Sequence, residues 1–205
     1  LHELRDLGLI HVASSDRFAE DDGELNDLLS RLKQLGEAQK ILNKQIDKKS
    51  PVPMNEPDVE RGSAIPREIE LVQGAITTLN QQLQVSLKER ELLRPWGNFD
   101  PENIERLRRA GYRVNFFVVP DNRYNPEWET VYDAVVVKRE TSRSYFITLS
   151  KNDNVADELD LEAVKLPEVS LAQLDELITT LRNRIQEEEQ RLKALTADLP
   201  SLKAA

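Results

Sequence analysis

Apolar residues recur at alternating three- and four-residue spacings in two widely separated stretches of the chain. The first contains Ile65, Ile69, Val72, Ile76, Leu79, Leu83 and Leu93, and the second contains Leu171, Leu174, Ile178, Leu181, Ile185, Leu192, Leu195 and Leu199. This spacing is the heptad seam of a helix that packs against another helix. Read in opposite directions, the two seams match, from Leu93 with Leu171 to Ile65 with Leu199. The pattern predicts a long antiparallel coiled-coil stem.

A third helical stretch precedes these two. Asp21 and Glu24 have the spacing of a capping box, and a seam follows through Leu25, Leu28, Leu32, Leu35, Gln39, Leu42 and Ile46. Prolines and a glycine predict an irregular link over residues 50–63, after which Pro66 suits a first helical turn. We therefore predict ascending helices over residues 20–94 and a descending helix over 170–200, which Ser170 and Gln173 begin as a second capping box.

The segment between the seams, residues 95–169, predicts a small α/β lobe. Proline and glycine at Pro95-Trp96-Gly97 end the ascending helix, and a short helix is expected between Asp100-Pro101 and Ala110-Gly111. Strands are predicted at 112–119, 131–137 and 144–149, the last two joined by a short polar turn that suggests a hairpin. We also expect residues 116–119 to be buried on both faces, Asn152-Asp153-Asn154 to open a helix, and residues 164–166 to end a fourth strand.

The first residues predict the remnant of another lobe. Leu1 to Leu7 is typical of a helix end, Gly8 of its cap, and Leu9 to Val12 of a strand that needs partners elsewhere. The overall prediction is an α+β protein: residues 1–19 are a proximal-lobe remnant, and a long antiparallel coiled-coil stem carries a small α/β distal lobe. Because the chain begins at a leucine, we interpret it as part of a longer protein.

Composition narrows the function classes. The 205 residues are 32% charged and 5% aromatic, which suits long helices with charged outer faces better than one large core. A net charge of −9 is opposite to the basic surface that nucleic acid requires. The sequence contains no cysteine and no apolar run of about 18 residues, the length that a membrane-spanning helix needs.

Residues able to support catalysis are scarce. The two histidines, His2 and His11, have no cysteine nearby to complete a zinc site, and the acidic group at 157–162 lacks the glycine-centred spacing of a calcium loop. Neither a phosphate-binding glycine loop nor a dinucleotide fingerprint occurs. The sequence therefore predicts no catalytic residue, no cofactor and no metal.

Partner-binding candidates lie in the lobe. Arg108 and Arg109 give its helix a basic side. The simplest interpretation of this side is a solvent-exposed helix face. Tyr124 and Trp128 occupy a polar loop, and aromatic residues in exposed loops are enriched at interfaces. Anchoring the core is an equally good role for these two aromatics. For Trp96, a wedge between stem and lobe is favoured over a stacking platform for a base.

Several runs of residues in this chain resemble a known protein family. The run Leu7-Gly8-Leu9-Ile10-His11-Val12, the two long helices, Pro95-Trp96-Gly97-Asn98-Phe99-Asp100 and the strand ending at 116–119 look like the cytoplasmic N-terminal half of V-type ATPase subunit I. This subunit is the prokaryotic counterpart of the a subunit.

The resemblance implies a non-catalytic stator arm of a rotary, ion-translocating complex at the cytoplasmic face of the membrane. Peripheral stalks made of E- and G-type subunits would dock on its lobes, and a C-terminal membrane domain would follow. The rival hypothesis is a coiled-coil arm closed by a hinge lobe, as in SMC (structural maintenance of chromosomes) proteins, or another coiled-coil scaffold.

Overall fold

The computed structural model describes residues 17–46, 53–151 and 155–205. These residues form a mostly helical α+β protein, as predicted. The elements in chain order are α2 (Arg17–Gln45), α3 (Val59–Leu93), η1 (Arg94–Trp96), α4 (Pro101–Arg109), β1 (Arg113–Pro120), η2 (Asp121–Arg123), α5 (Trp128–Val131), β2 (Val135–Glu140), β3 (Arg143–Ser150), α6 (Val155–Leu159), α7 (Leu171–Ala194), η3 (Leu195–Asp198) and α8 (Leu199–Ala204).

The chain divides into two compact units. The first comprises residues 1–74 and 189–205, and the second residues 75–188, so that α3 and α7 each contribute to both. No helix of the described residues is at once long enough and apolar enough to cross a membrane.

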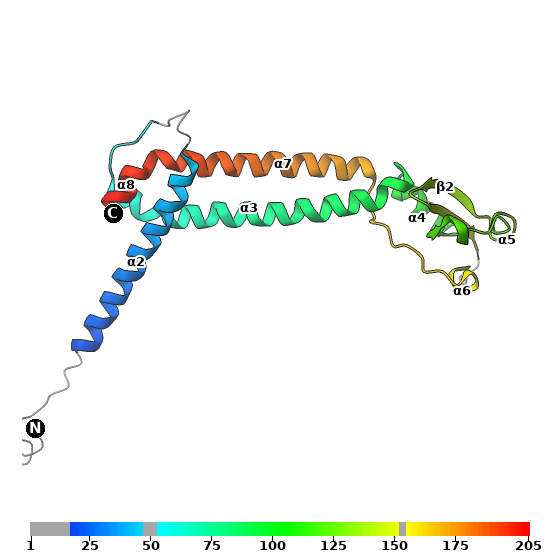
Figure 1. The fold of residues 1–205 in the computed structure, drawn as a ribbon, viewed down its shortest axis with the longest axis horizontal. Helices are drawn as coiled ribbons and strands as arrows, with labels where there is room; N and C mark the ends of the chain where they lie inside the picture. The colour runs from blue at the N-terminus through cyan, green and yellow to red at the C-terminus, as the bar shows by residue number, and fades with distance from the viewer. Residues whose placement is uncertain (1–16, 47–52, 152–154) are drawn as a thin grey trace, which may run out of the picture. The chain divides into compact units, whose positions relative to one another are not determined.

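In the second unit, α3 and α7 run side by side in opposite directions (Figure 1). Their apolar positions form one buried cluster, which contains Leu79, Leu83, Ile178, Leu181 and Ile185. Nearer the lobe, Ser86 is 4% exposed and the Arg90 guanidinium donates to the Asp175 carboxylate. The apolar seam residues of both helices therefore face each other in this unit, whereas Arg90 and Asp175 form an exposed ion pair.

The start of α7 confirms the predicted capping box. The backbone N–H of Ser170 donates to Oε1 of Gln173 over 2.8 Å, and the N–H of Gln173 donates to Oγ of Ser170 over 3.2 Å. Two N–H groups at the helix end thus gain partners.

We expect Ser170→Ala to lower the free energy of unfolding by about 1 kcal/mol, because the first turn of α7 loses its side-chain acceptor. Chemical denaturation followed by circular dichroism measures this loss. Thr180→Ala, in the middle of the same helix, is the control and should be neutral or slightly stabilising, since alanine has the higher helix propensity. An equal loss for the two variants would contradict the cap.

Three antiparallel strands in the order β1-β3-β2 form the sheet of the lobe. The predicted hairpin joins β2 to β3 through Thr141 and Ser142, whose φ angles of 53° and 59° suit a two-residue turn. Strand β2 begins at Val135, four residues later than predicted, because residues up to Val131 form the short helix α5.

Only one face of the sheet is fully buried. Phe117, Val119 and Phe146 point into a core with α6, where Val155 and Leu159 complete the packing. On the opposite face, residues 114, 116 and 118 are only half-buried. The expectation that residues 116–119 are buried on both faces is therefore wrong, because the second face is only partly covered.

Trp96 covers part of this second face. Its ring is 6% exposed and makes edge contacts with Phe116 and Tyr145 at centroid distances of 5.1 and 5.5 Å. The predicted wedge, in which Trp96 joins the end of α3 to the sheet, is confirmed.

The predicted fourth strand at 164–166 is wrong. This stretch passes the outer edge of β1, where the N–H of Val164 donates to the carbonyl of Phe116 over 2.7 Å. No strand is assigned between residues 161 and 169, and Pro167 has no N–H with which to extend the pairing.

In the first unit, both long helices begin earlier than predicted. Helix α2 starts at Arg17, so Asp21 lies inside it rather than at its cap. Helix α3 starts at Val59 because the Asp58 carboxylate accepts the N–H groups of Glu60 and Arg61, and Pro66 therefore lies inside the helix. The irregular part of the predicted link at 50–63 thus ends at residue 58.

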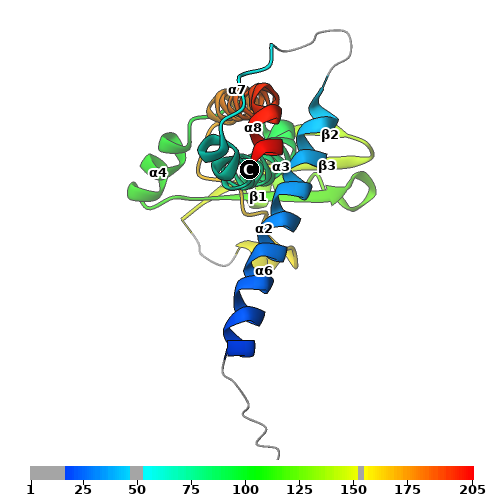
Figure 2. The ribbon, with the colours of Figure 1, turned by 90° about the vertical axis from the view of Figure 1, so that its left-hand side faces the viewer.

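Helix α8 packs closely against the rest of this unit (Figure 2). It contacts α2. Its Leu199 and Leu202 are buried, as are Leu42 of α2 and Ile65 of α3. The closest approach is at Gly62 of α3, where a Cβ atom would lie 2.1 Å from the carbonyl oxygen of Ser201. Glycine is therefore required there by space and not by backbone conformation.

Several predictions lie outside the described residues. They are the helix and strand within residues 1–12, both histidines, and the Asn152-Asp153-Asn154 helix start. The proximal-lobe remnant at 1–19 therefore stays a prediction.

Candidate functional site

Helix α4 forms one wall of the candidate site in the lobe. As predicted, it begins at the Asp100 cap, whose carboxylate accepts the N–H of Glu102 over 2.9 Å, with Pro101 in the first position. It ends at Arg109, and Gly111 just beyond it has a φ of 82°, the left-handed conformation that glycine adopts without strain. Glycine and proline therefore fix both ends of this wall.

A groove of about 730 Å³ lies between α4, β1 and the 164–168 segment. Apolar side chains line it: Phe99, Ile104, Val114, Phe116, Val164 and Leu166. Charged side chains line it as well: Glu102, Glu105, Arg108, Lys165 and Glu168. A groove with a mixed apolar and charged lining is suited to an amphipathic helix of a partner.

Arg108 and Arg109, the predicted basic contacts, lie on the exposed side of α4. Their side chains are 67% and 72% exposed, and both pair with Glu105, at 2.9 and 3.4 Å. Exposed pairs of this kind contribute little to stability, but they offset the basic charge of the helix. Arg108 lines the groove, whereas Arg109 is not among its lining residues.

Tyr124 belongs to the core of the lobe. It is 8% exposed, and its ring makes edge contacts with Trp128 and Phe146 at 5.5 and 5.3 Å. Its hydroxyl donates to Glu129 over 3.0 Å. Burial and this carboxylate raise the pKa of Tyr124 to about 12, so the phenol stays protonated at neutral pH.

Trp128 is half-buried against the same core. For Tyr124 the core-anchoring interpretation is therefore confirmed, and Trp128 shares that role. Of these two aromatic residues, only the exposed part of Trp128 is accessible to a binding partner.

Catalytic groupings do not emerge in the described part of the chain. No three residues among His, Cys, Asp and Glu there are placed to hold a metal ion. Ser144 is buried, and its hydroxyl donates to Asp121 over 2.7 Å. This pair has no described histidine that could act as a base.

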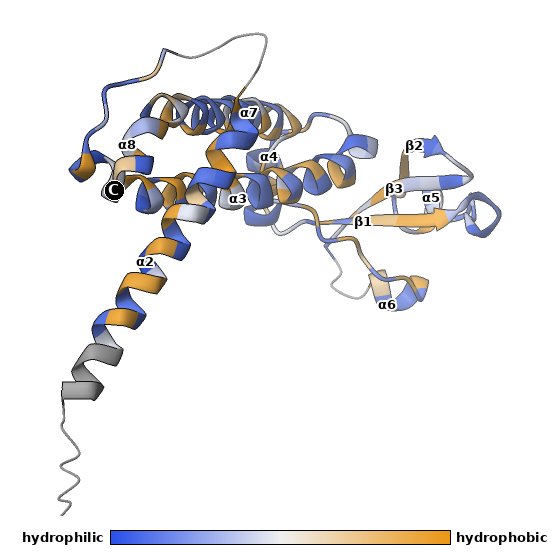
Figure 3. Ribbon diagram, turned by 60° about the vertical axis from the view of Figure 1, so that its left-hand side comes forward, coloured by the Kyte–Doolittle hydropathy of each residue, from blue (hydrophilic) through white to orange (hydrophobic). Residues whose placement is uncertain are grey.

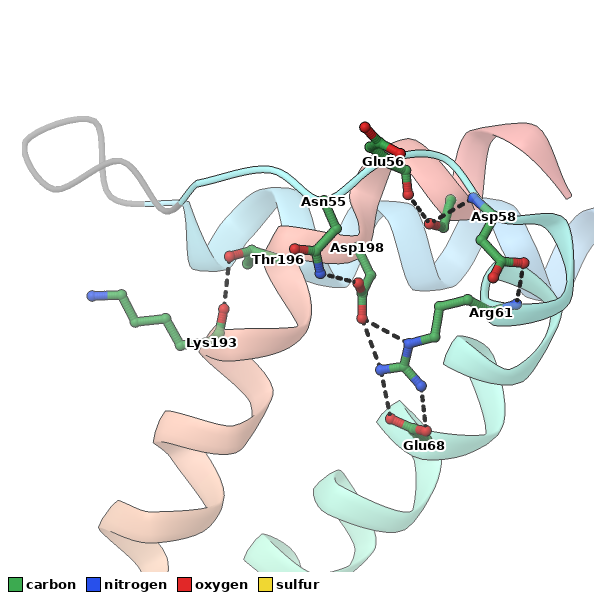
Figure 4. A network of polar contacts seen from close by, with 9 residues as sticks. Asn55, Glu56, Asp58, Arg61, Glu68, Lys193, Thr196 and Asp198 are labelled. Carbon is green, nitrogen blue, oxygen red and sulfur yellow. Dashed lines mark hydrogen bonds and ion pairs between the residues drawn. The ribbon is translucent and has the colours of Figure 1, made fainter.

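A second polar cluster lies in the first unit (Figure 4). Asp198, which is 7% exposed, accepts hydrogen bonds from Asn55 at 2.6 Å and from Arg61 at 2.8 Å. Arg61 also pairs with Glu68 at 2.6 Å. The hydrogen bonds that Arg61 donates to Glu68 and Asp198 raise the pKa of its guanidinium above the ordinary value, so it stays charged at any physiological pH.

Ser201 extends this cluster to the backbone. Its hydroxyl accepts the N–H of Asp58 at 3.1 Å and donates to the carbonyl of Glu56 at 3.3 Å. The cluster therefore ties three parts together: the 53–58 segment, the start of α3, and η3 with α8. We call this cluster the polar clasp. Its described hydrogen bonds and ion pairs connect parts of the fold, so we interpret its role as structural.

Sequence reasoning did not find the polar clasp. Asn55 and Asp58 lie in a stretch that reads as an irregular link, and their partners are 143 residues away in the chain. The one local signal was an aspartate immediately after Pro57, which is a common helix cap.

Comparison with known proteins gives no family. The chain matches no protein-family model and no curated protein.

Proposed function

We propose that this chain is a non-catalytic arm that presents a small lobe to a binding partner, and specifically a stator arm of a rotary V-type ATPase. The observation that carries the proposal is the apolar seam shared by α3 and α7, together with a lobe that carries a groove lined by apolar and charged residues. The resemblance of the Pro95 to Asp100 run to subunit I supplies the particular complex.

The stem part of the proposal is an antiparallel coiled coil. Helix α3 has 35 residues and α7 has 24, which at about 1.5 Å per residue corresponds to about 50 and 36 Å of helix. Two paired helices of this length transmit force better than a flexible linker. Small-angle scattering of the chain in solution should then give a maximum dimension well above that of a compact protein of this size.

The partner in this proposal is a peripheral stalk made of paired E- and G-type subunits. The groove beside α4 is the proposed docking place, because its mixed apolar and charged lining is suited to an amphipathic helix. Several stalks that share the load need only modest individual affinity, because tethering in one complex raises the effective concentration.

We expect the full chain to bind the E–G pair of the same organism with a dissociation constant on the order of 10 µM, measured by calorimetry. Arg108→Glu, at the rim of the groove, should weaken binding about tenfold. Arg109→Glu is the matched control, because it changes the same charge and the same Glu105 pairing outside the groove, and it should have a smaller effect.

Three outcomes would contradict this proposal or part of it. Absence of binding at about 200 µM stalk pair, with the chain folded by circular dichroism, would remove the stator assignment. Saturable binding to duplex DNA, with self-association through the lobe, would favour the SMC-like arm instead. Equal losses for the two arginine variants would move docking away from the groove.

A further inference from the structure

The N-terminal half of α2 carries an apolar stripe that no other described residue covers. Leu25, Leu28, Leu29 and Leu32 are 55%, 60%, 55% and 66% exposed. Figure 3 shows the same half of α2 with apolar residues along its length. In the C-terminal half of the helix, by contrast, Leu42 is fully buried, where η3 and α8 contact α2.

The spacing of the four leucines is specific for a helical partner. Steps of three, four and seven residues place them on one face of a helix, over about two turns. A stripe with this period matches the knobs-into-holes packing of a second helix, whereas a strand or an extended peptide would match every second residue.

The charged residues beside the stripe indicate that the partner helix is a second copy of α2. Glu24 and Arg31 are seven residues apart, so both lie on the same flank of the leucines. In an antiparallel pair of identical helices, Glu24 of each copy comes beside Arg31 of the other, and two ion pairs form. In a parallel pair, Leu29 would face Glu24 instead, and neither ion pair would form.

Arg31 is available for such a contact. One of its terminal nitrogens, Nη2, donates to Oγ of Ser63 over 2.6 Å. A guanidinium has five N–H donors, so others remain for a carboxylate.

We propose that α2 pairs with α2 of a second copy of this chain in an antiparallel, two-fold symmetric arrangement. In the register that brings Glu24 of each copy beside Arg31 of the other, Leu25 packs against Leu28 of the second copy, and both ion pairs lie along the same edge of the contact. The interface is isologous and therefore closes at a dimer. It involves only the first unit and does not depend on the stator role.

Sedimentation equilibrium of the full chain tests the dimer. We expect reversible association in the range of tens of micromolar, and we expect Leu28→Glu to weaken it at least about 100-fold by burying a charge in the contact. Leu71→Glu is the matched control, because Leu71 is also 60% exposed on a helix of the first unit but lies outside the stripe. It should leave the association constant unchanged.

The ion pairs are tested by charge exchange. Glu24→Arg and Arg31→Glu should each weaken the dimer about tenfold, and the double variant should restore it, because each new pair has opposite signs again. Failure of the double variant to restore association would overturn the antiparallel register.

A chain that stays monomeric up to about 500 µM would overturn the proposal as a whole. Protection of the amides of residues 25–32 from hydrogen exchange in that monomer would show that another segment of the same chain covers the stripe. Equal weakening by Leu28→Glu and Leu71→Glu would also count against it, because the contact would then not be at the stripe.

Discussion

Replacing Leu181 with aspartate should lower the free energy of unfolding by about 4 kcal/mol. Leu181 is 3% exposed and packs in the cluster with Leu79, Leu83, Ile178 and Ile185. The substitution removes apolar burial and also places a carboxylate where described neighbours are mainly apolar. Urea denaturation followed by circular dichroism, which reports mostly on the long helices, measures the loss.

Arg184→Asp is the control for this prediction. Arg184 lies on the exposed side of the same helix, three residues further along, so its replacement should cost less than about 1 kcal/mol. Equal losses for the two variants would mean that α7 does not bury the predicted seam. The comparison therefore tests the inward face of α7 without depending on any partner.

Replacing Gly62 with alanine should destabilise the protein by about 2 kcal/mol. In the interior of a helix this change ordinarily stabilises by up to about 1 kcal/mol, because alanine has the higher helix propensity. Here the added Cβ would lie 2.1 Å from the carbonyl oxygen and 2.6 Å from the carbonyl carbon of Ser201. Since both are backbone atoms, α8 has to move away, and its buried leucines become exposed.

Gly74→Ala is the matched control in the same helix. A Cβ at Gly74 would meet no atom within 4 Å, so this variant should gain about 0.5–1 kcal/mol. Thermal melts of the two variants should therefore shift in opposite directions. If both variants are stabilised, α8 does not pack against α3 in solution.

Local signals in the sequence predicted local structure well. Asp100 and Ser170 cap α4 and α7 as expected, because a cap depends only on residues within one helical turn. The strands β1 and β3 lie close to where the sequence predicted strands, although the predicted burial of residues 116–119 on both faces was wrong. These features need no knowledge of distant parts of the chain.

Errors arose where distant residues decide the structure. Pro66 suggested a helix start, but the cap at Asp58 and the close packing of α8 on Gly62 extend α3 past it. Likewise, residues 164–166 had the composition of a strand, yet Val164 makes one backbone hydrogen bond to β1. Propensity alone cannot weigh such tertiary contacts.

The candidate site was predictable only in part. The basic side of α4 was visible in the sequence, but its neutralisation by Glu105 and the groove beside it were not. The groove exists because the 164–168 segment lies near α4, and neither stretch signals the other. For Tyr124, the sequence left a contact role and a core role equally open, and burial decided for the core.

Both edges of the sheet carry features that discourage the addition of another strand. On β1, the carbonyl of Phe116 already accepts a hydrogen bond from the N–H of Val164, and Pro120 at the strand end has no N–H to donate. On β2, the pairing with β3 is broken by a bulge between Val136 and Lys138, and bulged edges pair poorly with other chains. A molecule that binds this lobe must therefore recognise its side chains, so specificity resides in residues that evolution can change one at a time without altering the sheet.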